Sequence, residues 1–154
     1  MIALIKDNFI TKEHCKKLID VYEKNKKQAK KFRDVFPLNI EKEQLDLNFI
    51  NDVHNISKTI NNSIIDWIQI VFWPTNSFQD LHYDNASNET TLSSICYLND
   101  NYEGGQTYFE EGTIFKPITG RIVFFDGKHY LHGVKKIISG NRYVIATWYK
   151  NETK

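Results

Sequence analysis

The strongest constraint on the fold is a change of hydrophobic period near Asp66. From this residue onward apolar side chains alternate with a period of two, which is typical of β-strands. Turn sequences rich in Gly, Asn and Asp separate the candidate strands. These strands are expected at 66–73, 79–84, 90–98, 106–109, 113–116, 121–126, 131–137 and 143–149. So many short, regularly spaced strands predict a β-sandwich or a jelly-roll barrel.

The first part of the chain has a helical period. A short strand is expected in 1–10, and Thr11 can cap a helix over about 12–27. A second helix is expected over 42–65. The apolar stripes behind these two predictions are Cys15, Leu18, Ile19 and Tyr22, and Phe49, Val53, Ile56, Ile60 and Ile64. We therefore expect an α+β protein of one domain, 1–154, with helical support in 1–65 and the β core in 66–150.

Composition excludes several classes of protein. The 154 residues suffice for one domain, and 41% hydrophobic with 25% charged residues is ordinary for a globular protein. A net charge of +1 lacks the basic bias of a nucleic-acid binder. No apolar run approaches the ~18 residues of a membrane span. With no secretory leader and only Cys15 and Cys96 as cysteines, we expect a soluble cytoplasmic protein with neither nucleic-acid nor membrane partners.

A run of lysines, between Lys24 and Lys31, covers the end of the first predicted helix and the residues after it. Such a run can bind an anionic partner, or it can be a solvated helix end in which lysines favour the negative end of the helix dipole. The second interpretation is preferred from the sequence alone.

Three side chains can form a metal site. His82 and Asp84 are two apart in a predicted strand and so face the same side, although this pair alone is a weak signal. His132, in a later strand, adds a second imidazole. Two histidines and one carboxylate form the facial triad of non-haem Fe(II) oxygenases. A zinc hydrolase uses similar residue types, so the triad by itself leaves the metal open.

Arg142 and Tyr97 can bind an anion near this triad. A turn at 139–141 would bring the Arg142 strand back beside the His132 strand. An arginine that points into an apolar barrel needs an anionic partner, and a dicarboxylate cosubstrate would supply one. Tyr97 could donate a hydrogen bond to the same carboxylate. Taken alone, the arginine could lie on the surface and the tyrosine could be an ordinary core residue.

Together these residues resemble a known family. The matching residues are His82-Tyr83-Asp84-Asn85, Tyr97-Leu98-Asn99, Gly104-Gly105-Gln106-Thr107, Pro117, Gly120, Phe124-Phe125, His132, Asn141-Arg142-Tyr143 and Trp148-Tyr149. In order and spacing they resemble the catalytic core of the Fe(II)/2-oxoglutarate prolyl 4-hydroxylases, especially the hypoxia-inducible-factor prolyl hydroxylases. The resemblance implies a double-stranded β-helix, or jelly roll, that uses O2 to hydroxylate a prolyl residue of a peptide or protein, with succinate and CO2 as co-products.

The resemblance also implies the roles of individual residues. His82, Asp84 and His132 would be the catalytic iron ligands, Arg142 and Tyr97 would bind 2-oxoglutarate, and Trp148 would border the substrate. The cofactors are then Fe(II) and 2-oxoglutarate, with ascorbate as an optional addition. His132 is preferred over His129 as the ligand because of the ten-residue step to Arg142. Trp73 stands near the position where the oxygen-sensing enzymes have a tyrosine that faces the cosubstrate, so this contact differs here.

Three other functions compete with prolyl hydroxylation. The substrate could be a free amino acid or another small molecule, or the barrel could be a cupin-like binding module without turnover. Nucleic-acid demethylation ranks low, because the alkylation-repair oxygenases carry a second arginine shortly after the first and none follows Arg142.

Overall fold

The computed structural model describes residues 1–84 and 87–152. Asn85, which belongs to the motif that begins at His82, lies outside the described residues. The helices are α1 (Lys12–Asn25) and α2 (Leu47–Asn61), with short 3-10 helices η1 (Lys26–Gln28) and η2 (Lys42–Gln44). The strands are β1 (Ile2–Lys6), β2 (Phe36–Ile40), β3 (Ser63–Trp73), β4 (Gln79–His82), β5 (Thr90–Tyr97), β6 (Glu103–Gly104), β7 (Thr107–Phe109), β8 (Ile114–Phe115), β9 (Ile122–Phe125), β10 (His132–Val134), β11 (Ile137–Ser139) and β12 (Arg142–Asn151).

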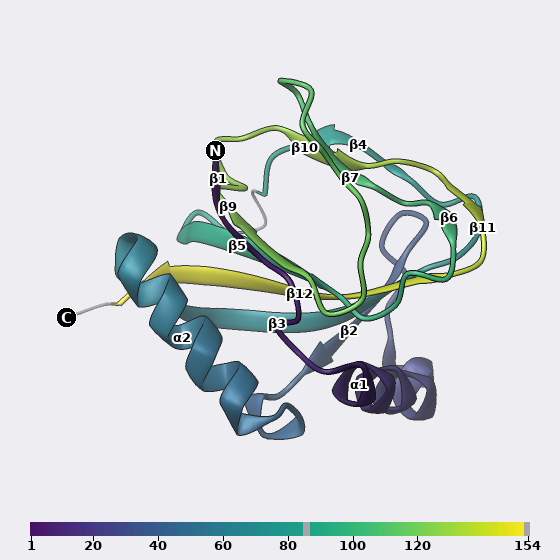
Figure 1. The fold of residues 1–154 in the computed structure, drawn as a ribbon, viewed down its shortest axis with the longest axis horizontal. Coiled ribbons are helices and arrows are strands. Elements are labelled where there is room, and N and C mark those ends of the chain that lie inside the picture. The colour runs from purple at the N-terminus through teal and green to yellow at the C-terminus, as the bar shows by residue number, and fades with distance from the viewer. Residues whose placement is uncertain (85–86, 153–154) are drawn as a thin grey trace.

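Two antiparallel sheets face each other, and both helices cover the outer face of the larger one (Figure 1). The major sheet has the order β1-β9-β5-β12-β3-β2, and the minor sheet has the order β4-β10-β7-β8. Strands β11 and β6 form a separate two-stranded ribbon. This is the α+β jelly-roll fold expected from the sequence.

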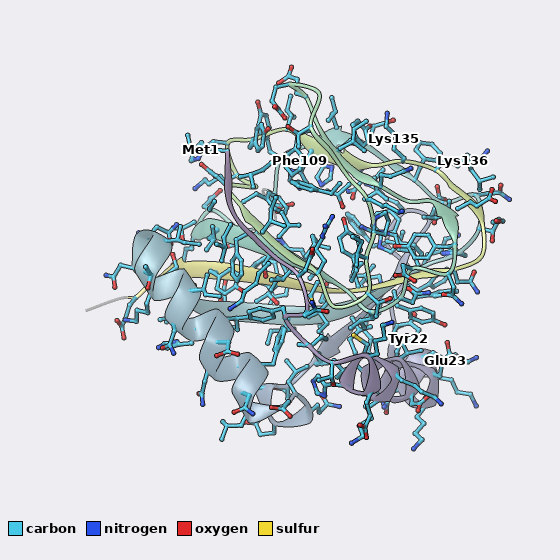
Figure 2. The ribbon with its side chains drawn as sticks, in the orientation of Figure 1. Met1, Tyr22, Glu23, Phe109, Lys135 and Lys136 are labelled. Carbon is cyan, nitrogen blue, oxygen red and sulfur yellow. The ribbon has the colours of Figure 1, made fainter. Side chains whose placement is uncertain are left out.

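The helices form because each has a cap and one apolar face. Thr11 accepts a hydrogen bond from the His14 backbone N–H at 3.1 Å, as expected for an N-cap. Leu18 of α1 and Val53 of α2 are buried against the major sheet together with Ile70 of β3. Figure 2 shows side chains filling both sides of this sheet, with Tyr22 on the helix side and Phe109 within the minor sheet.

The second helix is shorter than expected and the region before it is not purely helical. The predicted helix 42–65 ends at Asn61 because Asn62 adopts a left-handed backbone conformation, φ 56°, and β3 begins at Ser63. Two strands from 1–65, β1 and β2, pair with β9 and β3 in the major sheet. Residues 1–65 therefore add one expected strand, β1, and one unexpected strand, β2, to the β core.

The prediction that the His132 and Arg142 strands form a hairpin is wrong. The predicted strand 131–137 is two strands in the structure. Strand β10 pairs with β4 and β7 in the minor sheet, and β11 pairs with β6. After the turn at 139–141 the chain enters the major sheet, where β12 pairs with β3 and β5 along its length. His132 and Arg142 therefore belong to opposite sheets, and both line one cavity between them. Both cysteines are free and buried.

Candidate active site and metal centre

The three expected metal ligands meet at one point. His82 ends β4 and His132 begins β10, and the two residues are direct partners in the antiparallel pairing of these strands. Their ring centroids lie 4.4 Å apart. Asp84 Oδ1 lies 3.2 Å from His132 Nε2 and 3.7 Å from His82 Nε2. Among the described residues, ligand atoms of these three side chains all lie within 4.8 Å of one another.

Hydrogen bonds orient both imidazoles toward this point. The Nδ1 of His82 lies 2.9 Å from the Asp80 carbonyl oxygen, and that of His132 lies 2.8 Å from the Tyr130 carbonyl oxygen. Because a carbonyl oxygen only accepts, each Nδ1 carries the hydrogen. In a neutral ring Nε2 is then unprotonated and presents a lone pair. Each lone pair then faces the acceptor Oδ1 of Asp84. Such an arrangement of acceptors requires a proton or a cation between them, as a metal site does.

The carboxylate is held from its other side. Ser93 Oγ donates to Asp84 Oδ2 at 2.6 Å, and the Asp84 backbone N–H donates to the Gly127 carbonyl at 2.7 Å. Burial raises the pKa of Asp84, but a proton or positive charge at the two imidazoles and the hydrogen bond from Ser93 lower it more, so its pKa lies below the ordinary value. Asp84 is thus a carboxylate with one oxygen free for a cation.

Arg142 is a buried cation on the opposite sheet. It begins β12, is only 1% exposed, and lies over the Trp73 and Tyr97 rings at 4.9 and 5.5 Å. Its Nη2 donates to Thr107 Oγ1 at 3.3 Å, whereas Nε and Nη1 are buried without a hydrogen-bond partner. Buried guanidinium groups almost always pair with an anion. The unfilled donors therefore fit a carboxylate from a bound molecule.

Tyr97 contacts Arg142 with its ring, whereas its hydroxyl is directed to Thr107. Its side chain is fully buried, and its hydroxyl lies 2.6 Å from Thr107 Oγ1. Thr107 lines the cavity and Tyr97 does not. Thr107 therefore links Tyr97 to Arg142. The signal available in the sequence was the place of Thr107 in the Gly104–Thr107 segment that carries the family resemblance, and no role was predicted for it.

One cavity of about 750 Å³ joins the metal centre to Arg142. Trp148 lines it, half-buried and stacked on Trp67 with ring centroids 4.7 Å apart and an interplanar angle of 17°. Trp73 also lines the cavity, and its buried Nε1 has no hydrogen-bond partner. His129 is exposed and bonds Asp126, away from the triad. The alternative ligand considered from the sequence is therefore not part of the centre.

A two-histidine, one-carboxylate centre inside a jelly-roll fold is typical of the non-haem metal oxygenases. Residues 68–150, just over half of the chain, match the family described as 2OG-Fe(II) oxygenase superfamily. The chain belongs to this family. Fe(II) and 2-oxoglutarate are the metal and cosubstrate that the family implies, and the triad and the unpaired Arg142 donors fit them.

Several solved structures with the same fold carry the name prolyl hydroxylase. The viral collagen prolyl hydroxylase of Paramecium Bursaria Chlorella virus-1 is 18% identical, with a TM-score of 0.77 over 97% of this chain and 96% of that chain. The Pseudomonas putida prolyl-4-hydroxylase is 16% identical, with a TM-score of 0.79 over 97% and 92%. A Trichoplax adhaerens prolyl hydroxylase, solved with a hypoxia inducible factor peptide fragment, is 18% identical, with a TM-score of 0.75 over 96% and 83%.

Curated relatives are also hydroxylases. Human prolyl 3-hydroxylase 2 is 36% identical over 64 residues, which is 37% of this chain and 9% of that protein. A PKHD-type hydroxylase of Prochlorococcus marinus is 35% identical over 81 residues, 47% of this chain and 36% of that protein. The chain thus spans only a small part of the length of these relatives. The resemblance to the prolyl hydroxylases expected from the sequence is confirmed. Among the described residues, no helix is long and apolar enough to cross a membrane.

Proposed function

We propose that the protein is a dioxygenase that hydroxylates a prolyl residue in a peptide or protein and converts 2-oxoglutarate to succinate and CO2. The observation that carries the proposal is the buried, unpaired guanidinium of Arg142 in the same cavity as the triad. Prolyl hydroxylases among the relatives and structural neighbours support the choice of substrate. One of those neighbours was solved with a peptide fragment.

Each residue has a distinct task in this proposal. His82, Asp84 and His132 would hold the iron, and Ser93 fixes the carboxylate so that Oδ1 points to it. When bound, iron and 2-oxoglutarate supply the oxidising chemistry that activates O2. Arg142 would bind the far carboxylate by charge-assisted hydrogen bonds. Thr107, held between Arg142 and Tyr97, presents a hydroxyl to the same carboxylate.

The cavity walls supply orientation and exclude water. Phe125 packs its ring 4.7 Å from His132, so one side of the metal centre is apolar. The stacked Trp67 and Trp148 form a flat wall that a prolyl ring can contact. A cavity of this size accommodates a cosubstrate together with one side chain of a larger substrate.

Mass spectrometry of a proline-containing peptide tests the proposal. The peptide is incubated with the protein, Fe(II) and 2-oxoglutarate, with and without ascorbate, which the resemblance associates with this activity. We expect a mass gain of one oxygen atom on proline and equal formation of succinate. Succinate formation with free amino acids but with none of the peptides would favour a small-molecule hydroxylase. Metal binding without any succinate would favour a cupin-like binding module.

A further inference from the structure

The cavity mouth carries three cations on one tight hairpin between η1 and β2. Lys30, Lys31 and Arg33, here called the basic rim, line the cavity and are exposed. The hairpin is fixed by hydrogen bonds in both directions between the backbones of Phe32 and Val35, at 2.9 and 3.1 Å. Figure 1 shows this segment rising from the helix layer toward the minor sheet. The basic rim is therefore held in place at the mouth, so it is not a frayed helix end.

The cations of the basic rim have no anionic partner in the part of the chain that the structure describes. Among residues 1–84 and 87–152, none of them forms an ion pair, whereas neighbouring Lys26 pairs with Glu23. The single carboxylate among the residues that line the cavity is Asp84, which faces the metal centre. Asp34, next to Arg33 in the hairpin, does not line the cavity. With a net charge of only +1 for the whole chain, this concentration of positive charge is local.

Exposed aromatic side chains lie among these charges. Phe32 is 56% exposed, and Phe78 and Tyr83 are each 45% exposed, and all three line the cavity. The Arg33 guanidinium lies over the Phe32 ring at 5.4 Å. A mouth that combines cations with apolar rings matches a polypeptide that carries acidic and apolar side chains near its reacting residue.

We infer that the protein selects peptide segments with aspartate or glutamate close to the hydroxylated proline, through the basic rim. This inference rests on the proposed function and adds the charge of the substrate. An acidic peptide fits better than a nucleic acid, because nucleic acids engage cations spread along a phosphate backbone. Here all three cations come from one short hairpin.

Peptide binding tests the inference independently of turnover. Three fluorescent peptides share a central proline and have glutamate, glutamine or lysine at the same flanking positions. The fluorescence anisotropy of each peptide is measured while the full chain, loaded with Mn(II) and 2-oxoglutarate, is added. The test variant is K30Q/K31Q/R33Q, and the control K12Q/K16Q/K116Q removes the same charge at exposed positions outside the cavity. An exposed charge pair changes affinity by about two- to fivefold.

We expect the glutamate peptide to bind at least about tenfold more tightly than the glutamine peptide, because the free energies of three such charge pairs add. The preference should weaken with added salt, disappear in the test variant and persist in the control. Equal binding of the two peptides, or equal loss in both variants, would overturn the inference. Displacement by a single-stranded oligonucleotide at lower concentration than by unlabelled glutamate peptide would assign the rim to nucleic acid and also overturn it.

The same peptides separate this inference from the proposed function. If acidic peptides bind selectively but no proline gains oxygen, prolyl hydroxylation fails and the docking surface stands. If proline gains oxygen in all three peptides at equal KM, the proposed function stands and the charge selection fails.

Discussion

Replacing Arg142 with methionine is expected to raise the stability of the protein without ligand and, at the same time, to weaken cosubstrate binding strongly. The guanidinium is 1% exposed, and two of its nitrogens lack partners. Its contacts with the Trp73 and Tyr97 rings stabilise the folded protein by about 0.5–2 kcal/mol each. Burying an ion without a counter-ion costs several kcal/mol, which is more. Methionine fills similar space without charge, so the protein without ligand should gain about 1–4 kcal/mol, or several degrees in Tm.

The effect on the cosubstrate has the opposite sign. A carboxylate that loses its buried cation is left unpaired at a cost of about 3–5 kcal/mol, which raises Kd by roughly two to three and a half decades. Thermal unfolding with Mn(II) measures both effects. At about a hundredfold excess over Kd, 2-oxoglutarate should stabilise the wild type by about 2.7 kcal/mol, or roughly 5–10 °C. The same concentration of 2-oxoglutarate should raise the free energy of unfolding of Arg142→Met by no more than about 0.4 kcal/mol.

Arg121 provides the matched control, because it pairs with Asp7 and does not line the cavity. Arg121→Met should lower Tm and keep the full shift with 2-oxoglutarate. An Arg142→Met variant that is less stable without ligand, or that keeps the wild-type shift, would refute the assignment of Arg142 as an anion receptor.

Three further predictions concern the support of the site and of the fold. Ser93→Ala removes the hydrogen bond to Asp84 and should weaken Mn(II) binding by about 10–100-fold in a chelator competition, whereas unchanged affinity would reject its orienting role. Gly127→Ala places a methyl group against the Asp84 carboxylate and 2.6 Å from Ser93 Oγ, so calorimetry should detect no Mn(II) binding, and a variant that binds normally would contradict the packing. The Arg121 hydrogen bonds lower the pKa of Asp7. Their stabilisation is therefore present above the ordinary pKa of 3.8 and is lost as pH falls below it. The Tm deficit of Asp7→Asn should shrink between neutral and acidic pH, and a deficit independent of pH would contradict the ion pair.

The helices and most strands could be predicted because their apolar periods reflect burial on one face. The end of α2 could not, since the left-handed conformation of Asn62 interrupts a helical spacing that continues to Ile64. Strand β2 was not predicted; it contains Pro37, which is unfavourable inside a sheet but is tolerated here because β2 is an edge strand of the major sheet. The sequence also could not show that β12 pairs with β3 and β5, because strand pairing depends on the whole sheet.

The candidate site was predicted where residue type carries the chemistry. His82, Asp84 and His132 were expected to converge, and the structure brings them together. Ser93 and Thr107 were not found, because a serine or threonine in a strand is ordinary until its neighbours are known. The run that ends at Lys31 was interpreted as a solvated helix end, and only the hairpin that places Lys30, Lys31 and Arg33 at the cavity mouth changes that interpretation.

An anaerobic titration with Fe(II) and 2-oxoglutarate, followed by visible absorption, examines the site most directly. A weak charge-transfer band should appear only when both are present, saturate at one iron per chain, and be absent in His82→Ala and His132→Ala. In Arg142→Met the band should require far more 2-oxoglutarate. A wild-type protein that shows no band, or an Arg142→Met variant that titrates like the wild type, would contradict the account.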